Sequence, residues 1–281
     1  MSADRYAVVG HPVEHSKSPW IHARFAALTG QPVRYEKLLA PLDAFAATVE
    51  RFRAEGGRGC NVTVPFKFDA CALATRLSER AALAGACNTL RFDGAEVFGD
   101  NTDGIALVRD IEIGAARPLA GQRVLLLGAG GAAAGVLGPL LQSGVAEVLV
   151  ANRTLAKATA VVQRHAGLAR SRKVRLDAMA LDALGDKGSF DVVVNATASS
   201  LAGDALTLPV SVLRTGTLAY DLMYGAAADG FLDWAARHGA DPRDGLGMLV
   251  EQAAEAFEVW RGVRPPTAPV LRDLRVLLQA G

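Results

Sequence analysis

The feature that most constrains the fold is the stretch 124–135, with the sequence VLLLGAGGAAAG. Its four apolar residues stop at Gly128, as in a buried parallel strand that meets a tight turn. Gly128, Gly130 and Ala133 match the G-x-G-x-x-G/A fingerprint of a dinucleotide-binding turn. The first glycine makes the bend, the second lets a pyrophosphate approach the backbone, and the next helix points its positive end at the phosphates. The stretch therefore predicts a nucleotide site at the edge of a parallel sheet.

A membrane helix is the alternative for this region, because no charged residue lies between Arg123 and Glu147. The region contains six glycines and Pro139, however. A membrane helix is richer in Leu, Ile and Phe. We therefore favour the nucleotide turn and expect no membrane span.

Composition narrows the class of protein further. The chain has 281 residues, enough for one large or two ordinary domains, and 51% of them are hydrophobic. Its net charge of +1 gives no reason to expect a nucleic-acid or anionic-membrane partner. The first residues contain no signal-peptide core, and Cys60, Cys71 and Cys87 form an odd, sparse set without metal-ligand spacing. These features predict reduced thiols, no metal and a cytoplasmic location.

The order of apolar runs and turn residues predicts an α/β chain. From Gly121 onward, strands alternate with helical stretches, as in a doubly wound parallel sheet. The strands are expected at 124–127, 148–151, 174–176, 190–195 and 218–221. Before Gly121 we expect shorter strands, helices and a hairpin turn at Asp93-Gly94. The helices expected near 249–260 and 271–278 have no strand between them and are expected to pack on the N-terminal part.

Polar residues of the N-terminal part cluster where elements end. Ser16 and Ser18 precede a helix, and their ordinary role would be capping. Lys67 follows the carboxyl end of a strand, where open sheets bind ligands, although an exposed lysine is the ordinary explanation. Asp103 ends the run GDNTD and could equally cap the helix that follows it. In the C-terminal part, Gln252 lies on the apolar face of the helix expected near 249–260. Its polar side chain needs a hydrogen-bond partner, either substrate or backbone.

The end of the second strand in the later half indicates which dinucleotide is bound. An NAD enzyme usually carries an acidic residue there, which binds the ribose 2′-hydroxyl. This chain instead has Asn152, Arg153 and Thr154, followed by Lys157. Cations and neutral donors would hold a 2′-phosphate that a carboxylate would repel. We therefore expect NADP, against the alternative of a helix cap with exposed cations.

The clusters together resemble the shikimate dehydrogenase family along nearly the whole chain. The matching motifs are HSKSP (15–19), NVTVPFK (61–67), GACNT (85–89), DNTDG (100–104), GAGGA (128–132), NRT (152–154), NAT (195–197), DLMY (221–224) and GLGMLVEQ (245–252). The resemblance implies NADP-dependent, reversible reduction of 3-dehydroshikimate to shikimate, in aromatic amino-acid biosynthesis. It also implies a two-domain α/β fold with a Rossmann-type domain. Residues 1–103 would bind substrate, 104–244 would bind NADP, and 245–281 would return to the first domain, with the active site between the two domains.

The resemblance also assigns the site residues. Lys67 and Asp103 would be catalytic. The substrate would be bound by Ser16, Ser18, Thr63, Lys67, Asn88, Asp103, Tyr224 and Gln252. The cofactor would be bound by Glu79, Gly128, Ala129, Gly130, Gly131, Ala132, Asn152, Arg153, Thr154, Lys157, Thr197, Leu222, Gly245 and Met248.

Two departures and two alternatives accompany this assignment. Lys157 stands where the family commonly has arginine. Lysine cannot bind a phosphate bidentately as arginine does, so this difference weakens the expected contact. Ala198 stands where serine is frequent, a difference that we expect to be silent. A paralogue acting on quinate or an amino analogue is one alternative, and a non-catalytic NADP-binding regulator is the other. We expect a small-molecule substrate and a monomer or homodimer.

Overall fold

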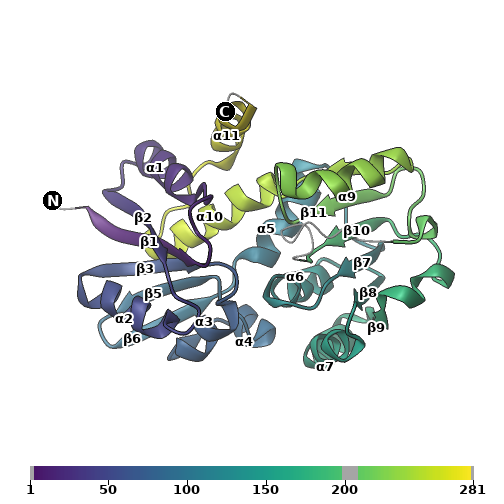
Figure 1. The fold of residues 1–281 in the computed structure, drawn as a ribbon, viewed down its shortest axis with the longest axis horizontal. Coiled ribbons are helices and arrows are strands. Elements are labelled where there is room, and N and C mark those ends of the chain that lie inside the picture. The colour runs from purple at the N-terminus through teal and green to yellow at the C-terminus, as the bar shows by residue number, and fades with distance from the viewer. Residues whose placement is uncertain (1–2, 198–207, 280–281) are drawn as a thin grey trace. The chain divides into compact units, whose positions relative to one another are not determined.

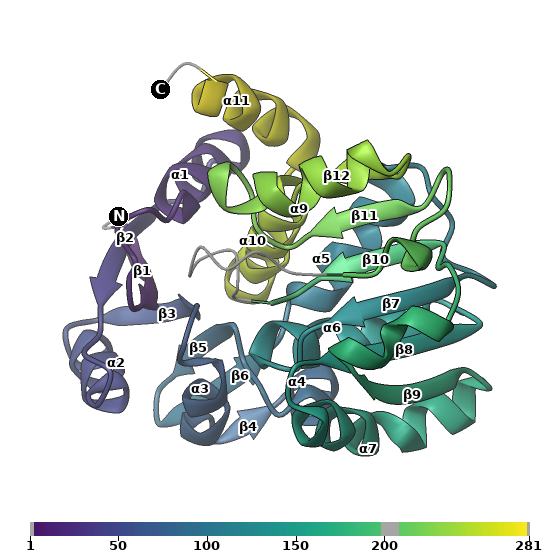
Figure 2. The same ribbon diagram turned by 45° about the vertical axis from the view of Figure 1, so that its right-hand side comes forward.

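The computed structural model describes residues 3–197 and 208–279, so Ala198 lies outside the described residues. The chain forms two compact units (Figures 1 and 2). Unit 1 comprises Met1–Ala106 together with Leu249–Gly281, and unit 2 comprises Leu107–Met248. Unit 1 is therefore assembled from both ends of the chain.

Unit 1 contains a six-stranded sheet in the order β2-β1-β3-β5-β6-β4. Its elements are β1 (Asp4–Gly10), α1 (Ser18–Thr29), β2 (Val33–Leu39), α2 (Phe45–Ala54), β3 (Gly57–Val62), α3 (Lys67–Leu73), β4 (Arg76–Leu77), α4 (Glu79–Ala84), β5 (Thr89–Asp93), β6 (Glu96–Asp100), the start of α5 (Asp103–Arg109), most of α10 (Leu246–Arg261) and α11 (Thr267–Gln279). Strand β1 pairs in parallel with β2 and β3, whereas β5 is antiparallel to β3 and β6. The predicted hairpin forms, with Gly94 at a φ of +60°.

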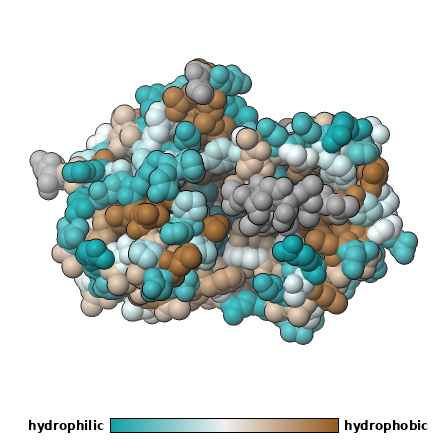
Figure 3. Space-filling model, viewed as in Figure 1, coloured by the Kyte–Doolittle hydropathy of each residue, from teal (hydrophilic) through white to brown (hydrophobic). Residues whose placement is uncertain are grey.

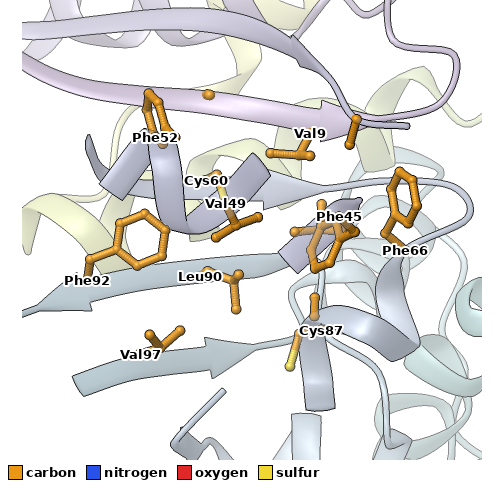
Figure 4. Packing of buried hydrophobic residues seen from close by; sticks show 14 of the residues in the cluster. Val9, Phe45, Val49, Phe52, Cys60, Phe66, Cys87, Leu90, Phe92 and Val97 are labelled. Carbon is orange, nitrogen blue, oxygen red and sulfur yellow. The ribbon is translucent and has the colours of Figure 1, made fainter. Parts of the chain in front are cut away.

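The core of unit 1 lies between the sheet and the helix α2. Figure 4 shows Val9, Cys60 and Leu90, on three neighbouring strands, meeting Phe45 of this helix. Phe45 also stacks on Phe66 with ring centroids 4.9 Å apart. Phe66 immediately precedes α3, so this stack anchors the start of the helix that carries Lys67.

The C-terminal helix α10 packs against the N-terminal part, as the sequence predicts. Trp260 stacks on Tyr6 with ring centroids 4.6 Å apart, and its indole nitrogen donates to the Leu90 carbonyl at 3.0 Å. The neighbouring aromatic cluster includes His22, which stacks on Tyr35 at 4.2 Å. Unit 1 therefore needs α10 to complete its hydrophobic core.

Unit 2 is built on a fully parallel six-stranded sheet in the order β12-β11-β10-β7-β8-β9. Its elements are the end of α5, the π-helical η1 (Asp110–Gly114), β7 (Arg123–Leu127), α6 (Gly131–Gln142), β8 (Glu147–Asn152), α7 (Leu155–Arg172), β9 (Arg175–Ala180), η2 (Leu181–Asp186), β10 (Val192–Asn195), η3 (Val210–Val212), β11 (Leu218–Asp221), α9 (Ala226–Arg237), β12 (Asp241–Arg243) and the start of α10. The sequence predicts a doubly wound sheet here, and the structure confirms it.

Alternation along the strands explains how both faces of this sheet are buried. Leu125 and Leu127 face a cluster that includes Phe231 of α9, whereas the intervening Leu126 is equally buried on the opposite face. Several details differ from the sequence prediction. Strand β10 begins at Val192 rather than residue 190, the helix expected after the run GDNTD turns π-helical at Asp110, and β4 and β12 were not predicted.

The apolar segment that follows Arg123 forms the strand β7 and the helix α6. Among the described residues, no helix combines the length and the apolar character needed to span a membrane. On the face shown in Figure 3, hydrophilic residues are spread widely and hydrophobic ones form separate small areas.

Candidate functional site

Ser16 and Ser18 lie at the amino end of α1. The Ser18 N–H donates to Ser16 Oγ at 3.3 Å, so the loop brings the two serines together. Lys17 occupies the position that precedes the helix and makes no side-chain capping hydrogen bond. The structure thus offers two partly buried hydroxyls beside the positive end of a twelve-residue helix.

Lys67 and Asp103 form a partly buried ion pair. Lys67 Nζ lies 2.6 Å from Asp103 Oδ2, and the two side chains are 13% and 2% exposed. Lys67 begins α3 and Asp103 begins α5, so the starts of two helices position the pair. Asp103 uses one of the three donors of the ammonium group, which leaves the others for a further acceptor.

Asn88 connects this pair to Gln252. Its side-chain nitrogen donates to Asp103 Oδ1 at 2.9 Å and to Gln252 Oε1 at 3.1 Å. Its side-chain oxygen accepts from the Thr102 N–H at 2.9 Å and from Thr89 Oγ1 at 3.0 Å. These opposite requirements fix the orientation of the amide. The partner of Gln252, left open by the sequence, is therefore a side chain of unit 1.

Two residues of this network were not selected from the sequence. Thr102 is fully buried and holds Asn88, and Asn101 Oδ1 accepts from the Asp103 N–H at 3.1 Å. Both belong to the run DNTDG, whose four consecutive polar residues before a helix were the available signal. Thr63 follows β3 and donates its N–H to the Val9 carbonyl at 2.9 Å, and its side chain is partly buried.

The turn between β7 and α6 has the geometry that a pyrophosphate requires. Gly128 has a φ of +106°, which only glycine adopts readily. Among the described residues, a Cβ atom added to Gly130 would meet no heavy atom within 4 Å, which leaves space above this glycine. Gly130 precedes α6 and has no side chain that could cap it. The N–H groups of Gly131 and Ala132 lie in the first turn, where backbone N–H groups have no partner within the helix. The turn therefore fits a dinucleotide phosphate.

Exposed donors follow β8. Arg153, Thr154 and Lys157 are exposed, and within the described residues neither cation forms an ion pair. Thr154 precedes α7 but makes no side-chain capping bond, which disfavours the capping explanation for this residue. Asn152 Nδ2 donates to the Thr154 carbonyl at 2.9 Å and so shapes the loop.

The ends of β10 and β11 complete this edge of the sheet. Thr197 Oγ1 donates to Asn195 Oδ1 at 2.8 Å, and the Asn195 amide donates to Asp221 Oδ2 at 2.8 Å. Burial raises the pKa of Asp221 to about 6, although the hydrogen bonds from Met223 and Asn195 oppose the rise.

The remaining predicted site residues occupy separate elements. Leu222 follows β11, and its carbonyl approaches Gly245 so closely that a Cβ there would lie 2.3 Å from it. Met248 is buried in the first turn of α10, and Tyr224 follows β11 in unit 2, where burial raises its pKa. Glu79 is exposed at the start of α4 in unit 1.

Among the described residues, no group of three or more His, Cys, Asp or Glu side chains could hold a metal.

Comparison with known proteins shows which protein family this chain resembles. Family models match residues 8–90 (shikimate dehydrogenase substrate binding domain), 112–202 (shikimate / quinate 5-dehydrogenase) and 245–275 (shikimate 5'-dehydrogenase C-terminal domain). A shikimate dehydrogenase (NADP(+)) from Acidovorax sp. strain JS42 is 62% identical over 280 residues, which cover 100% of this chain and 99% of that protein.

Two solved structures extend the comparison. An Ael1 enzyme from Pseudomonas putida has a TM-score of 0.86 and 49% identity, covering 97% of this chain and 98% of that one. A shikimate 5-dehydrogenase from Thermus thermophilus, solved with NADP(H) and shikimate, has a TM-score of 0.79 and 33% identity, covering 97% and 98%. With its two-unit α/β fold, its Rossmann-type sheet and these matches, the chain belongs to the shikimate dehydrogenase family.

Proposed function

We propose that this protein is an NADP-dependent shikimate dehydrogenase, which reduces 3-dehydroshikimate reversibly to shikimate in aromatic amino-acid biosynthesis. The observation that carries the proposal is the Lys67–Asp103 pair at 2.6 Å, held by Asn88 in a chain that belongs to this family. A carbonyl reduction needs a positive donor at the oxygen that becomes a hydroxyl, and Lys67 supplies one.

The substrate is bound by unit 1. Ser16 and Ser18 bind its carboxylate, supported by the positive end of α1. Thr63, Asn88 and Gln252 face the ring hydroxyls, and the family resemblance adds Tyr224 to the set. Asn88 contributes chiefly by fixing the Asp103 carboxylate and the Gln252 amide, because its own amide already bonds to both.

Lys67 acts on the reacting oxygen. NADPH, when bound, supplies the hydride that is transferred to the carbonyl carbon. The Lys67 ammonium donates a hydrogen bond to the carbonyl oxygen and either transfers its proton or stabilises the charge that develops there. Asp103 orients the ammonium group through their ion pair, in which Nζ and Oδ2 are 2.6 Å apart.

The cofactor is bound by unit 2. The turn from Gly128 to Ala132 holds the pyrophosphate, and the open space at Gly130 supports this assignment. Asn152, Arg153, Thr154 and Lys157 hold the adenosine end and its 2′-phosphate, because no carboxylate stands among them to repel it. The family resemblance adds Thr197, Leu222, Gly245 and Met248, and Glu79 from unit 1.

We further propose a cytoplasmic enzyme, monomeric or homodimeric, with no nucleic-acid partner. The net charge of +1 and the three free cysteines support this proposal. Light scattering of the purified protein measures the oligomeric state, and a mass above that of a dimer would contradict it.

Steady-state turnover by purified protein tests the function. Shikimate and quinate are each oxidised with NADP⁺ and with NAD⁺, and we expect the highest kcat/KM for shikimate with NADP⁺. A higher kcat/KM for quinate would assign the protein to a quinate-oxidising paralogue. No turnover of any pair, with NADP⁺ still bound, would support the non-catalytic regulator instead.

A further inference from the structure

Asp221 is a buried carboxylate that has no role in the proposed function. It is 0% exposed at the carboxyl end of β11. Its Oδ2 accepts from Asn195 Nδ2 at 2.8 Å, and its Oδ1 accepts from the Met223 N–H at 2.8 Å. Within the parts of the chain that the structure describes, no basic side chain pairs with it. A buried carboxylate held only by two neutral donors is costly and needs an explanation.

The carboxylate determines how the Asn195 amide is oriented. An ionised carboxylate only accepts hydrogen bonds, so Asn195 must turn its NH₂ group towards Asp221. Its oxygen then faces Thr197, where it accepts from the backbone N–H at 3.2 Å and from Oγ1 at 2.8 Å. The position of Thr197 therefore depends on the charge at Asp221, two hydrogen bonds away.

The segments that Asp221 holds pack directly against the proposed cofactor site. A Cβ on Gly128 would lie 2.9 Å from the Ala196 carbonyl oxygen and 3.2 Å from the Thr197 nitrogen, so this backbone touches the phosphate-binding turn. On the other side, the Met223 carbonyl accepts from the Gly245 N–H at 2.8 Å. Asp221 thus braces two loops that carry residues assigned to the cofactor.

The strand order indicates which half of the dinucleotide these loops meet. A dinucleotide crosses a doubly wound sheet where the strand order reverses, which here lies between β7 and β10. Its adenosine end is assigned to the loop after β8, on one side of β7. When the cofactor is bound, its nicotinamide end would therefore lie on the side of β10 and β11.

We infer that Asp221 is a positioning residue for the nicotinamide half of the cofactor. Its carboxylate holds Thr197 through Asn195, and it holds the turn at Met223 directly. This inference rests on the proposed function, because it requires that unit 2 binds NADP(H).

Exchanging the partners of the Asp221–Asn195 hydrogen bond tests this role. Asp221→Asn removes one of two acceptors, so either Met223 or Asn195 loses its partner. We expect the Kd for NADPH, measured by fluorescence titration, to rise about tenfold, because Thr197 or the turn at Met223 then leaves the position that the bound cofactor requires. The KM for shikimate should change less than the Kd for NADPH, because the assigned substrate residues lie in unit 1 except Tyr224, which follows the turn at Met223. Asn195→Asp places two carboxylates face to face and should weaken NADPH binding at least as much.

The double variant Asp221→Asn/Asn195→Asp should restore binding. The new amide at position 221 keeps an oxygen for the Met223 N–H and donates to the new carboxylate at position 195, whose second oxygen still accepts from Thr197. Net charge is unchanged. We expect a Kd for NADPH within about threefold of wild type, which is less than the loss from one broken hydrogen bond.

A carboxylate at the amino end of β10, away from the proposed cofactor site at the carboxyl ends of the strands, provides the control. Asp191 Oδ2 accepts from the Arg123 N–H at 2.8 Å, at the amino end of β10. Asp191→Asn should lower the melting temperature but leave the Kd for NADPH unchanged. An unchanged Kd in Asp221→Asn, or a double variant that regains thermal stability but not affinity, would show that Asp221 is only structural. Wild-type protein that fails to bind NADPH would overturn the proposed function, and this inference with it, before any variant is compared.

Discussion

At the residue scale, Lys67 is the side chain on which the proposed chemistry depends most. Lys67→Ala removes both the positive charge and the proton donor beside Asp103. We expect kcat to fall about 100-fold or more, the range for loss of one general acid. The KM and Kd for NADPH should stay near wild type, because Lys67 belongs to unit 1 and the phosphate turn to unit 2.

Lys67→Arg separates the two roles left open for the ammonium group. Arginine keeps the charge but does not release a proton in proteins. Recovery of most of the activity would assign Lys67 to charge stabilisation, whereas a rate as low as that of Lys67→Ala would assign it to proton transfer. Near-normal turnover by Lys67→Ala would contradict the mechanism altogether.

Arg153 should determine the preference for NADPH over NADH. It is exposed beyond β8, and a charge-assisted hydrogen bond contributes about 1.5–3 kcal/mol, or roughly tenfold to a hundredfold in kcat/KM. Arg153→Ala should lose that much efficiency with NADPH and almost none with NADH. Added salt should weaken the wild-type preference, because an exposed charge is screened.

Arg172→Ala is the control for this charge. Arg172 is exposed in the last turn of α7, about 26 Å along the helix from its start. It should leave both kcat/KM values unchanged. Equal losses with both cofactors in Arg153→Ala would mean that this residue shapes the loop and does not bind the 2′-phosphate.

His22 should make the protein less stable in acid. Burial lowers the pKa of His22 from 6.5 to about 3, and neither ring nitrogen has a hydrogen-bond partner among the described residues. The unfolded chain therefore takes up a proton below about pH 6.5 that the folded chain refuses until about pH 3. Protonation favours the unfolded state throughout this window. The free energy of unfolding should fall by roughly 2–3 kcal/mol from this residue between about pH 6 and pH 4.

Urea denaturation at several pH values measures this contribution. His22→Phe keeps an aromatic ring against Tyr35 and removes the titrating group, so its stability should decline less steeply in acid than that of wild type. His15→Ala, at an exposed position, is the control. Parallel pH profiles for wild type and His22→Phe would contradict the assignment.

At the element scale, the turn between β7 and α6 contains two glycines that differ in backbone conformation and in the space around them. A Cβ on Gly130 would lie more than 4 Å from every heavy atom of the described residues, so Gly130→Ala should keep the wild-type melting temperature. It should nevertheless raise the Kd for NADPH at least tenfold, because the methyl group occupies the space assigned to the pyrophosphate. Thermal melting and fluorescence titration of the same sample check both halves of this prediction.

Two further variants separate ligand clash from backbone strain at this turn. Gly128→Ala combines a φ of +106° with a Cβ only 2.9 Å from the Ala196 oxygen, so it should lose both stability and NADPH affinity. Gly144→Ala also has a positive φ, of +81°, but its nearest neighbour would lie 3.9 Å away. It should lose stability alone. Unchanged NADPH affinity in Gly130→Ala would place the pyrophosphate elsewhere.

Elements with a strong hydrophobic pattern could be predicted from the sequence. β7 is an unbroken apolar run that ends at a glycine, and its predicted limits differ from the observed ones by one residue. The edge strand β12 was missed because it has three residues, one of them Pro242, which normally argues against a strand. β4 has two residues, too few for any periodicity. Asp110, where the π-helical turn begins, accepts hydrogen bonds from Tyr220 and Arg243, which are distant in sequence.

The candidate site was predictable in part, for a similar reason. The sequence motifs predict Lys67, Asp103 and Gln252 as site residues, and the structure joins their side chains through Asn88. That they contact a ligand stays a prediction. The orientation of Asn88 was not predictable, since it depends on donors and acceptors from β5, α5 and α10 at once. The relation of Asp221 to Thr197 is likewise a property of two neighbouring strand ends.

At the scale of the whole molecule, the two units should differ in their ability to fold alone. Unit 2 is one continuous segment with its own buried cluster on the α9 face. The fragment 107–248 should therefore unfold cooperatively on heating and bind NADPH. The fragment 1–106 lacks α10, whose Trp260 stacks on Tyr6, and should show no cooperative transition. Calorimetry of both fragments tests this, and a folded 1–106 fragment would contradict it.

The discontinuity of unit 1 has a consequence for the newly made chain. Residues 1–106 leave the ribosome first, but α10 and α11 follow only after the 142 residues of 107–248 have been translated. At about 5–20 residues per second, that delay lasts roughly 7–30 seconds. During this time unit 2 can fold, while Tyr6 and Tyr35 still lack Trp260 and their apolar surface stays open to chaperones. The part proposed to bind the substrate is thus the last to mature.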